Sequence, residues 1–389
     1  MALQRSLRSK AQSAGKSGSG VTKGSQKKSP GRKMAIAKAQ KLVSHGKAKP
    51  SQLLLDLGRD LVQAVLVKRP STRNKSPWVA DVRLKTGRIA LAHLPALDMG
   101  GLCVEGSQML LKPAVNSKGE LVGANSVGPY GTPKCEYIIQ LVRVNEPENK
   151  GCGGVWCAAH PNLGEKLAHK LLENGLVKEL PLSATSLQKE VSGVAGCPMR
   201  ADFVAEHKDG SNSVIEVKTV LNTDYNPATA PNRKECVYLG PSKPYKRAGI
   251  FPWGRVAQVG PKGEKVVSAR AIKHVDELAS IAKGQRRSST PLHSLLMFVV
   301  VRHDVEYMRI NEESCSSFAQ HAASAAASGV RFAAHRVRWG EGKDLGRAYW
   351  DGPLKVQIPP VRESSSAKGA CKERPVSSGA RRLKVQKTT

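Results

Sequence analysis

The apolar run at residues 295–301, LLMFVVV, constrains the fold of this chain more than any other stretch. A strand without polar alternation has no face left for water, so it must lie inside a parallel or mixed sheet that is covered on both sides. A helical pattern at 268–282, with Ser268 as a capping residue, precedes the run. The Ala- and Ser-rich segment SFAQHAASAAAS and the strand pattern VRFAAHRVRW follow it. This succession of helices and strands predicts an α/β unit.

The region before residue 150 has a different pattern, in which short β-rich runs are separated by Gly, Pro and Asn. The runs are WVADVRLKTGRIALAHL, GSQMLLKPA and CEYIIQLVRV, and Lys-Thr-Gly in the first marks a tight hairpin. Several short antiparallel strands in so few residues predict a small barrel or a meander. The segment NLGEKLAHKLLENGL then has leucines at helical spacing and closes with Asn-Gly, which predicts a helix with a C-terminal stop.

These patterns divide the chain. We expect a disordered basic tail at 1–50, a β domain at 51–150 and an α/β domain at 151–345. Within the α/β domain, residues 223–267 are dense in Pro, Gly, Asn and basic residues, which predicts a surface insertion. Residues 346–389 are expected to form a basic C-terminal tail.

The formal net charge is +31, and its distribution along the chain matters as much as its size. The first fifty residues hold thirteen basic residues and no acidic one, and the segment after Pro360 is also basic. The expected folded part keeps a positive balance as well, which indicates a polyanionic partner, DNA or RNA. For the tails alone, solubility or targeting is an alternative explanation.

The compartment is constrained by cysteine and hydropathy patterns. Eight cysteines without a C-x-x-C pair indicate neither a zinc site nor a disulfide framework, so we expect an intracellular, reducing compartment. The longest apolar run is too short for a membrane span, so no membrane association is expected. The start, MALQRSLRSKAQSA, is typical of mitochondrial or plastid presequences, whereas KKSPGRK suits nuclear import, and the two stay open. The sequence makes no prediction of oligomeric state.

A hairpin at 199–220, MRADFVAEHKDGSNSVIEVKTV, carries the candidate chemistry. Glu216 and Lys218 are two residues apart and share one strand face, and Asp202 lies on the preceding strand. If Asp202 and Glu216 converge, the two carboxylates and a backbone carbonyl such as that of Val217 would suit Mg²⁺ or Mn²⁺. The alternative is an ordinary solvated strand face.

Other polar residues complete this hypothesis. Lys218 could hold an attacking water or a phosphate oxygen, and Glu190 is a candidate outer ligand. The helix at 268–282 would supply phosphate contacts from Arg270, Lys273 and His274.

The order of these motifs resembles the bacterial sugar fermentation stimulation protein A family. The resemblance spans about residues 60–340, outside both tails and most of 223–267. It rests on LVKR, WVADVRLKTGRIALAHLPALDMGGLCVEG and GVWCAAHPNLGEKLAHKLL in the first half, and on LQKEV, the hairpin, SARAIKHVDELASIA and LLMFVVVRHDV in the second. Three positions depart from the family pattern: Ala271 follows Arg270, Pro95-Ala96-Leu97-Asp98 replaces Pro-Asn-Thr-Gly, and Met199 stands before Arg200.

The resemblance implies an OB-like β-barrel followed by a mixed-sheet α/β domain of the PD-(D/E)XK nuclease type, α+β overall, in a protein that binds DNA. By position, it assigns the metal acids to Asp202 and Glu216 and the catalytic lysine to Lys218. Arg270 and His274 match the family's helix. Further candidates for nucleic-acid contacts are Lys68, Arg69 and Arg200.

Three functional hypotheses follow. The leading hypothesis is a DNA-binding protein whose nuclease-type domain hydrolyses phosphodiesters with a metal ion. The alternatives are a regulatory DNA-binding protein without turnover and an RNA-processing or organelle nucleic-acid factor.

Overall fold

The computed structural model describes residues 52–96, 99–146, 153–232, 236–241 and 244–361 of the 389-residue chain. The predictions for residues 1–50, for Leu97-Asp98 and for the tail after 361 lie outside the described residues. The described residues belong to one compact unit, which contains a small barrel and a larger open sheet. The predicted mixed fold, a β-barrel with an α/β sheet, is confirmed.

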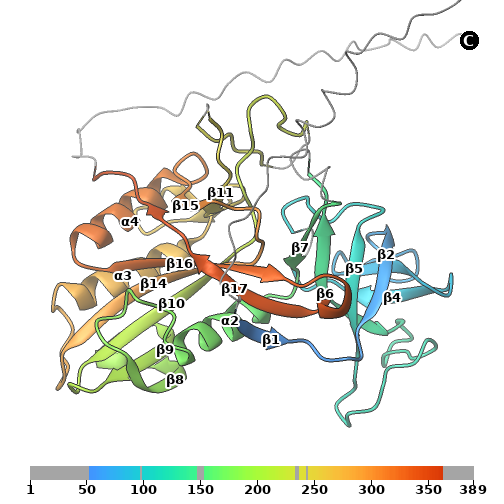
Figure 1. Ribbon diagram of the computed structural model, residues 1–389, viewed down its shortest axis with the longest axis horizontal. Helices are drawn as coiled ribbons and strands as arrows, with labels where there is room; N and C mark the ends of the chain where they lie inside the picture. Colours follow the sequence, from blue (N-terminus) through green and yellow to red (C-terminus); the bar gives the residue numbers. More distant parts are fainter. Residues whose placement is uncertain (1–51, 97–98, 147–152, 233–235, 242–243, 362–389) are drawn as a thin grey trace, which may run out of the picture. The chain divides into compact units, whose positions relative to one another are not determined.

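The barrel is closed by five strands in the order β4-β3-β2-β5-β6, because β4 also pairs in parallel with β6. A sixth strand, β7, pairs with residues 141–144 of β6, beyond the two residues that pair with β4 (Figure 1). The bounds are β2 (Val62–Lys68), β3 (Val79–Leu84), β4 (Ile89–His93), β5 (Gln108–Pro113), β6 (Tyr137–Val144) and β7 (Val155–Ala158). The Lys-Thr-Gly hairpin joins β3 to β4 as predicted, with Gly87 at a φ of 84° that favours glycine.

The open sheet has seven strands in the order β1-β17-β16-β14-β10-β9-β8. The bounds are β1 (Leu53–Asp56), β8 (Ala184–Ser192), β9 (Arg200–His207), β10 (Asn212–Val220), β14 (Leu292–Val300), β16 (Arg331–Trp339) and β17 (Arg347–Pro353). The apolar run lies on β14 at the centre and pairs in parallel with β10 and β16. The prediction of a parallel strand buried on both faces is therefore confirmed.

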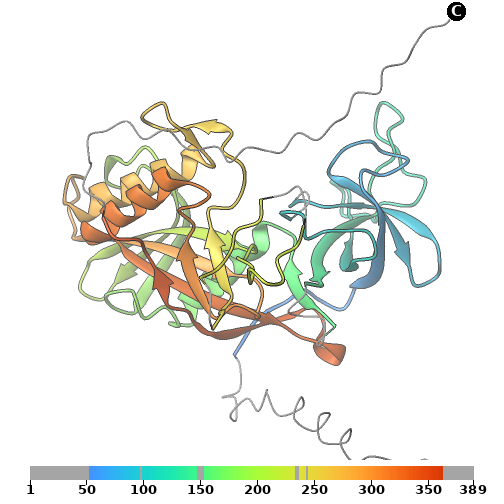
Figure 2. The same cartoon turned by 90° about the horizontal axis from the view of Figure 1, so that it is seen from above.

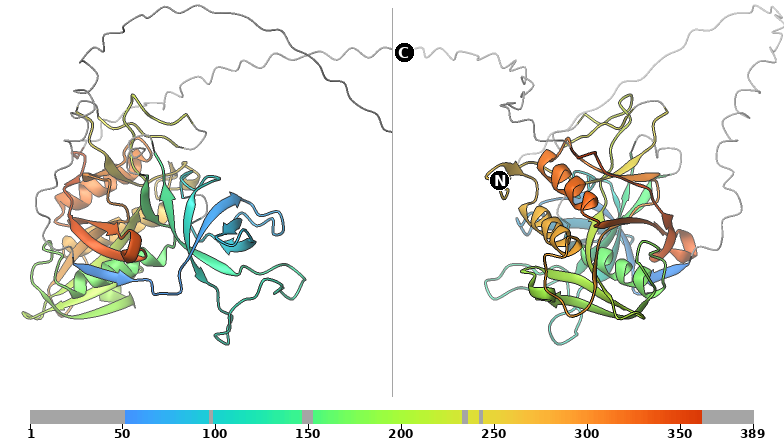
Figure 3. Two further views of the ribbon diagram at one scale, coloured as in Figure 1. Left: turned by 45° about the vertical axis from the view of Figure 1, so that its right-hand side comes forward. Right: turned by 90° about the vertical axis from the view of Figure 1, so that its left-hand side faces the viewer.

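Within the described ranges, three helices cover this sheet: α2 (Asn162–Glu173), α3 (Ala269–Ala282) and α4 (Ser316–Ala327). The right-hand view of Figure 3 shows α2 on the opposite side of the sheet from α3 and α4, which lie side by side in Figure 2. Side chains of β14 alternate between the two sides, so that Met297 joins the core around α2 while Phe298 joins the core around α3 and α4. Among the described residues, no helix combines the length and the apolar character that crossing a bilayer requires.

The helix boundaries follow from the predicted caps. The Ser268 hydroxyl accepts a hydrogen bond from the backbone N–H of Ala271 at 3.2 Å and so begins α3. Gly175, at a φ of 62°, follows the end of α2, as the Asn-Gly pair predicted. In the first turn of α2, Gly164 packs against Thr219 of β10 so closely that an added Cβ would lie 1.7 Å from the threonine hydroxyl oxygen.

The segment 223–267 is more than the predicted surface excursion. Asp224 and Tyr225 are fully buried, and the Asp224 carboxylate accepts hydrogen bonds from the Ala248 N–H at 2.9 Å and from Arg309 at 3.0 Å. The segment contributes β11 (Ala248–Phe251) to a small sheet with β15 (Tyr307–Ile310) and β18 (Val356–Gln357), and a short hairpin of β12 (Gln258–Val259) and β13 (Lys265–Val266). The polar and basic composition of the segment gave no indication of these buried residues and strands.

Two expected boundaries also need correction. β1 is an edge strand of the open sheet, paired with β17, and not part of the barrel region assigned to 51–150. β17 and β18 lie within 346–361, which was expected to be tail. Both errors have one cause: these strands are short and pair over a long sequence separation, which local patterns do not reveal.

A buried ionic network joins the end of the barrel to the end of β14. The Glu146 carboxylate accepts hydrogen bonds from Arg247 and Arg302 at 2.5 Å each and from the Tyr225 hydroxyl at 2.5 Å. Arg302 is completely buried and also bonds to Asp304 at 2.7 Å. Because each charge in this network is buried against an opposite charge, removal of one member would leave its partners uncompensated.

Candidate functional site

The β9–β10 hairpin brings the two predicted acids together. Phe203 pairs with Ile215 in the antiparallel register, which places Asp202 opposite Glu216. The Asp202 carboxylate accepts a hydrogen bond from the Val217 N–H at 2.7 Å, and this bond holds it against β10. The even-numbered side chains here point to the sheet face that α3 covers, so the acids lie between the sheet and that helix.

Glu216 is buried, and nitrogen atoms of the other described side chains contact only one of its two carboxylate oxygens. Its Oε1 atom lies 2.5 Å from the Lys218 Nζ and 2.5 Å from the His274 Nδ1, while its Oε2 atom is buried without a hydrogen-bond partner among the described residues. Burial alone would raise the pKa of Glu216, but His274 and Lys218 outweigh it and the pKa is lowered. Glu216 is therefore an ionised carboxylate with one oxygen left for another partner.

Asp202 has the opposite electrostatic behaviour. Burial and the neighbouring Glu216 carboxylate raise the pKa of Asp202 to about 6, against the lowering effect of the Val217 N–H and Lys218. Two adjacent carboxylates, one ionised and one with a raised pKa, are typical of functional sites, and a bound cation would favour the ionised form of both.

α3 supplies the other side of the site. His274 is buried, and its Nε2 accepts a long hydrogen bond of 3.4 Å from the Arg270 Nε. Since a guanidinium can only donate, this bond places the imidazole proton on Nδ1, which faces Glu216 although it lies off the line of a hydrogen bond. His274 thus contacts the acid and is too buried for the phosphate contact predicted from sequence, whereas Arg270 and Lys273 are exposed on the same helix.

Glu190 and Arg200 lie near the acids in register but pair with each other. Lys189 and Val191 pair with Phe203 and Ala201, so Glu190 is across from Asp202 on the edge strand β8. Its backbone has a φ of 53°, and its carboxylate forms a 2.5 Å ion pair with Arg200. Over the described ranges no three His, Cys, Asp or Glu side chains form a group that could hold a metal, so Glu190 does not complete such a set.

Lys68 and Arg69 belong to the barrel, at the end of β2. Lys68 is exposed, and the Arg69 guanidinium donates to the backbone carbonyl of Pro77 at 2.9 Å. No contact recorded for either residue joins it to the acids within the described part of the chain. The structure thus groups Asp202, Glu216, Lys218, His274 and Arg270 and leaves the other predicted residues apart.

The residues of this site fit a hard divalent cation. Two adjacent carboxylates offer oxygen ligands, one of them with an unpartnered buried oxygen. Mg²⁺ characteristically takes one or two protein carboxylates and completes its shell with water and substrate phosphates, so a third protein acid is not required.

Comparisons with known proteins agree on one family. The family model described as "Sugar fermentation stimulation protein RE domain" matches residues 265–343, which include α3, β14 and β16. A sugar fermentation stimulation protein homolog of Microcystis aeruginosa is 26% identical over 177 residues, which is 45% of this chain and 62% of that protein. A homolog of Maricaulis maris is 26% identical over 277 residues, 71% of this chain and 89% of that protein.

A solved structure shares the fold. The structure of Pyrococcus furiosus SfsA in complex with Ca²⁺ superposes with a TM-score of 0.51 over 79% of this chain and all of that chain, at 16% identity. The first of the relatives above is thus matched over less than two thirds of its length, whereas the solved chain is covered completely.

Proposed function

This chain belongs to the sugar fermentation stimulation protein family, and we propose that it binds DNA and that its α/β part cleaves phosphodiester bonds with a divalent metal ion held by Asp202 and Glu216. The observation that carries the proposal is the arrangement of these acids. They lie side by side on β9 and β10, the pKa of Asp202 is raised by burial and by Glu216, and one Glu216 oxygen has no hydrogen-bond partner among the described residues.

A divalent metal bound there would stabilise charge on the phosphate and activate a water molecule. The Ca²⁺ named for the P. furiosus protein is an oxygen-seeking ion, which supports the same class of cation here, and Mg²⁺ or Mn²⁺ is our choice for the reaction.

The chain's own residues divide the remaining work. Lys218 presents a compact positive charge beside Glu216, where it can hold a phosphate oxygen. Arg270 and Lys273 are exposed on α3 and can contact the backbone of the nucleic acid. Asp202 holds a proton below about pH 6, so its ligand oxygen becomes available only as the pH rises.

Electrostatics supports a nucleic acid as the partner. The net charge of +31 gives affinity for polyanions that depends on salt rather than on base sequence. The preference for DNA rests on the family resemblance.

The test is plasmid nicking and gel-shift by the purified full chain with Mg²⁺, Mn²⁺ or EDTA. The informative variants are Glu216→Gln and Lys218→Ala. The matched control is Glu206→Gln, because Glu206 is an exposed acid on the same hairpin that bonds to Ser186. We expect metal-dependent nicking in the wild type and the control, and binding without nicking in both site variants.

Two results would count against the proposal. DNA that shifts at low salt but is never cut would identify a non-catalytic DNA-binding protein. Nicking that survives in both site variants would assign it to a contaminant or to other residues.

A further inference from the structure

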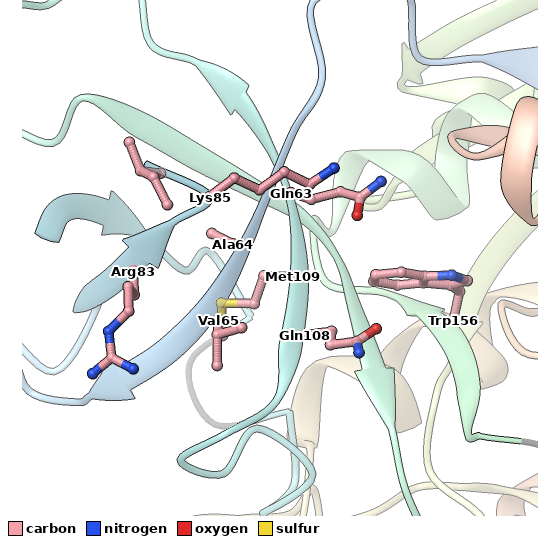
Figure 4. Close-up of a pocket in the computed structure, with 9 residues that line it drawn as sticks. Gln63, Ala64, Val65, Arg83, Lys85, Gln108, Met109 and Trp156 are labelled. Atoms are coloured by element: carbon pink, nitrogen blue, oxygen red, sulfur yellow. The ribbon is translucent and has the colours of Figure 1, made fainter. Parts of the chain in front are cut away.

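The outer face of the barrel carries a pocket that is separate from the site on β9, β10 and α3. It has a volume of about 210 Å³ and lies over β2, β3 and β5, with Trp156 of β7 at one side (Figure 4). The register explains its form: Val65 of β2 pairs with Arg83 on β3 and with Gln108 on β5, so these three side chains form a row across three strands. Val65 is 36% exposed at the centre of the row, which gives the pocket an apolar middle.

The pocket is lined by positively charged and neutral polar side chains. Of the described residues, Arg83 and Lys85 are the only charged ones that line it, and none of its described lining residues is an acid. The carboxamides of Gln63 and Gln108 also line it, and all four side chains are exposed. Within the described ranges none of the four has a recorded side-chain hydrogen bond or ion pair, so their donors and acceptors are available to a ligand.

The size of the pocket limits what it can receive. Pockets for whole drug-sized ligands or cofactors are typically about 300–1,000 Å³, so 210 Å³ suits a single planar ring system. The carboxamides of Gln63 and Gln108 can donate and accept hydrogen bonds at the edge of a base. The positive charges of Arg83 and Lys85 match the phosphates of a nucleic-acid backbone.

A second pocket adjoins the first. It shares Gln63 with the first pocket and has a volume of about 340 Å³. Arg59, Lys343 and Arg347 line it together with one acid, Asp56, which forms an ion pair with Arg347, so the balance of charge is positive. Two adjacent pockets that share a side chain and have a positive balance of charge fit a polymer with repeated anions better than a free nucleotide.

We propose that the barrel pocket receives an unpaired base of single-stranded nucleic acid, with Arg83 and Lys85 on the neighbouring phosphates. The base must be unpaired because one inside a duplex is stacked and cannot enter such a pocket. The proposal takes the nature of the polymer from the proposed function, but it uses residues separate from the acids on β9 and β10.

The test measures binding of a fluorescein-labelled DNA dodecamer by anisotropy at several salt concentrations, with RNA of the same sequence and the DNA duplex as further arms. The variant is Arg83→Gln with Lys85→Gln. The control, Lys118→Gln with Lys134→Gln, removes the same charge from exposed positions of the β5–β6 connection, outside the pocket. We expect about tenfold weaker single-strand binding in the pocket variant and a salt slope reduced by about 1.4, from about 0.7 per lost phosphate contact.

Trp156 gives an independent readout, because its ring lines the pocket. Trp156 is only 3% exposed, so a base would lie beside its ring rather than stack on it. Such a base should quench part of the tryptophan fluorescence in the wild type, and Trp156→Phe should lose that part while it still binds the oligonucleotide.

The outcomes separate this proposal from the nuclease proposal. If the pocket variant binds single strands as tightly as the control, or if the quench persists in Trp156→Phe, the pocket is not the binding site. If the wild type binds duplex but no single strand, this inference alone fails. If it binds neither, both proposals fail. Retained plasmid nicking in the pocket variant, together with retained oligonucleotide binding in Glu216→Gln, would support two separate sites.

Discussion

The pKa of Asp202 predicts an unusual pH dependence of stability. The pKa is raised from 3.8 to about 6 in the folded chain, so the native state holds this proton more tightly than the unfolded state does. The contribution of Asp202 is therefore most favourable below about pH 4, is lost progressively between about pH 4 and 6, and stays lost above that range. Asp202→Asn removes the ionisation and keeps an oxygen that can accept the Val217 N–H.

The magnitude follows from the same values. A change from 3.8 to about 6 corresponds to about 3 kcal/mol, and partial exposure of the side chain reduces this by screening to about 2 kcal/mol. We therefore expect Asp202→Asn to be about 2 kcal/mol more stable than the wild type at pH 7.5 in EDTA and equally stable at pH 4. A metal ion that binds the wild type should close the gap at pH 7.5, because binding to the native state adds stability.

Urea unfolding of both proteins at the two pH values, with EDTA or Mg²⁺, is the assay. A stability difference that is the same at pH 4 and pH 7.5 would refute the reasoning, since it would show that the substitution acts through packing and not through the Asp202 proton. Asp209→Asn is the matched control, because the pKa of this exposed acid is lowered by its bonds to Ser211.

Two further predictions concern packing. Glu146→Gln should lower the free energy of unfolding by about 3–5 kcal/mol in urea, because Arg302 and Arg247 would lose their buried counter-charge, and a loss below 1 kcal/mol would mean that water reaches the network. Gly164→Ala should cost about 1–3 kcal/mol through overlap with the Thr219 hydroxyl, and Thr219→Ala in the same chain should restore part of this in thermal unfolding. An unchanged midpoint in Gly164→Ala would show that α2 can move away from β10.

The sequence predicted those elements whose evidence lies within the element itself. LLMFVVV indicated the central strand, Ser268 the start of α3, and the two-residue spacing of Glu216 and Lys218 their common face. What failed was pairing over distance: nothing near β1 indicates that its partner is β17, and nothing near Asp224 indicates that Arg309 will bury it.

The candidate sites show the same limit. The hairpin predicted that Asp202 and Glu216 are close, because one turn joins their strands. The burial of His274 against Glu216 depends on how α3 docks, and the row of Val65, Arg83 and Gln108 depends on the register of three strands. Such tertiary choices could not be read from the residues alone.

The placement of β1 has a consequence for synthesis on the ribosome. Arg347, which binds Asp56, follows it by 291 positions, and the whole barrel is made between the two. At about 5–20 residues per second, β1 waits about 15–60 s for its partner strand. During this delay the barrel can form while the first strand of the other sheet remains unpaired, so the nascent chain presents an open β-edge that a chaperone would need to shield.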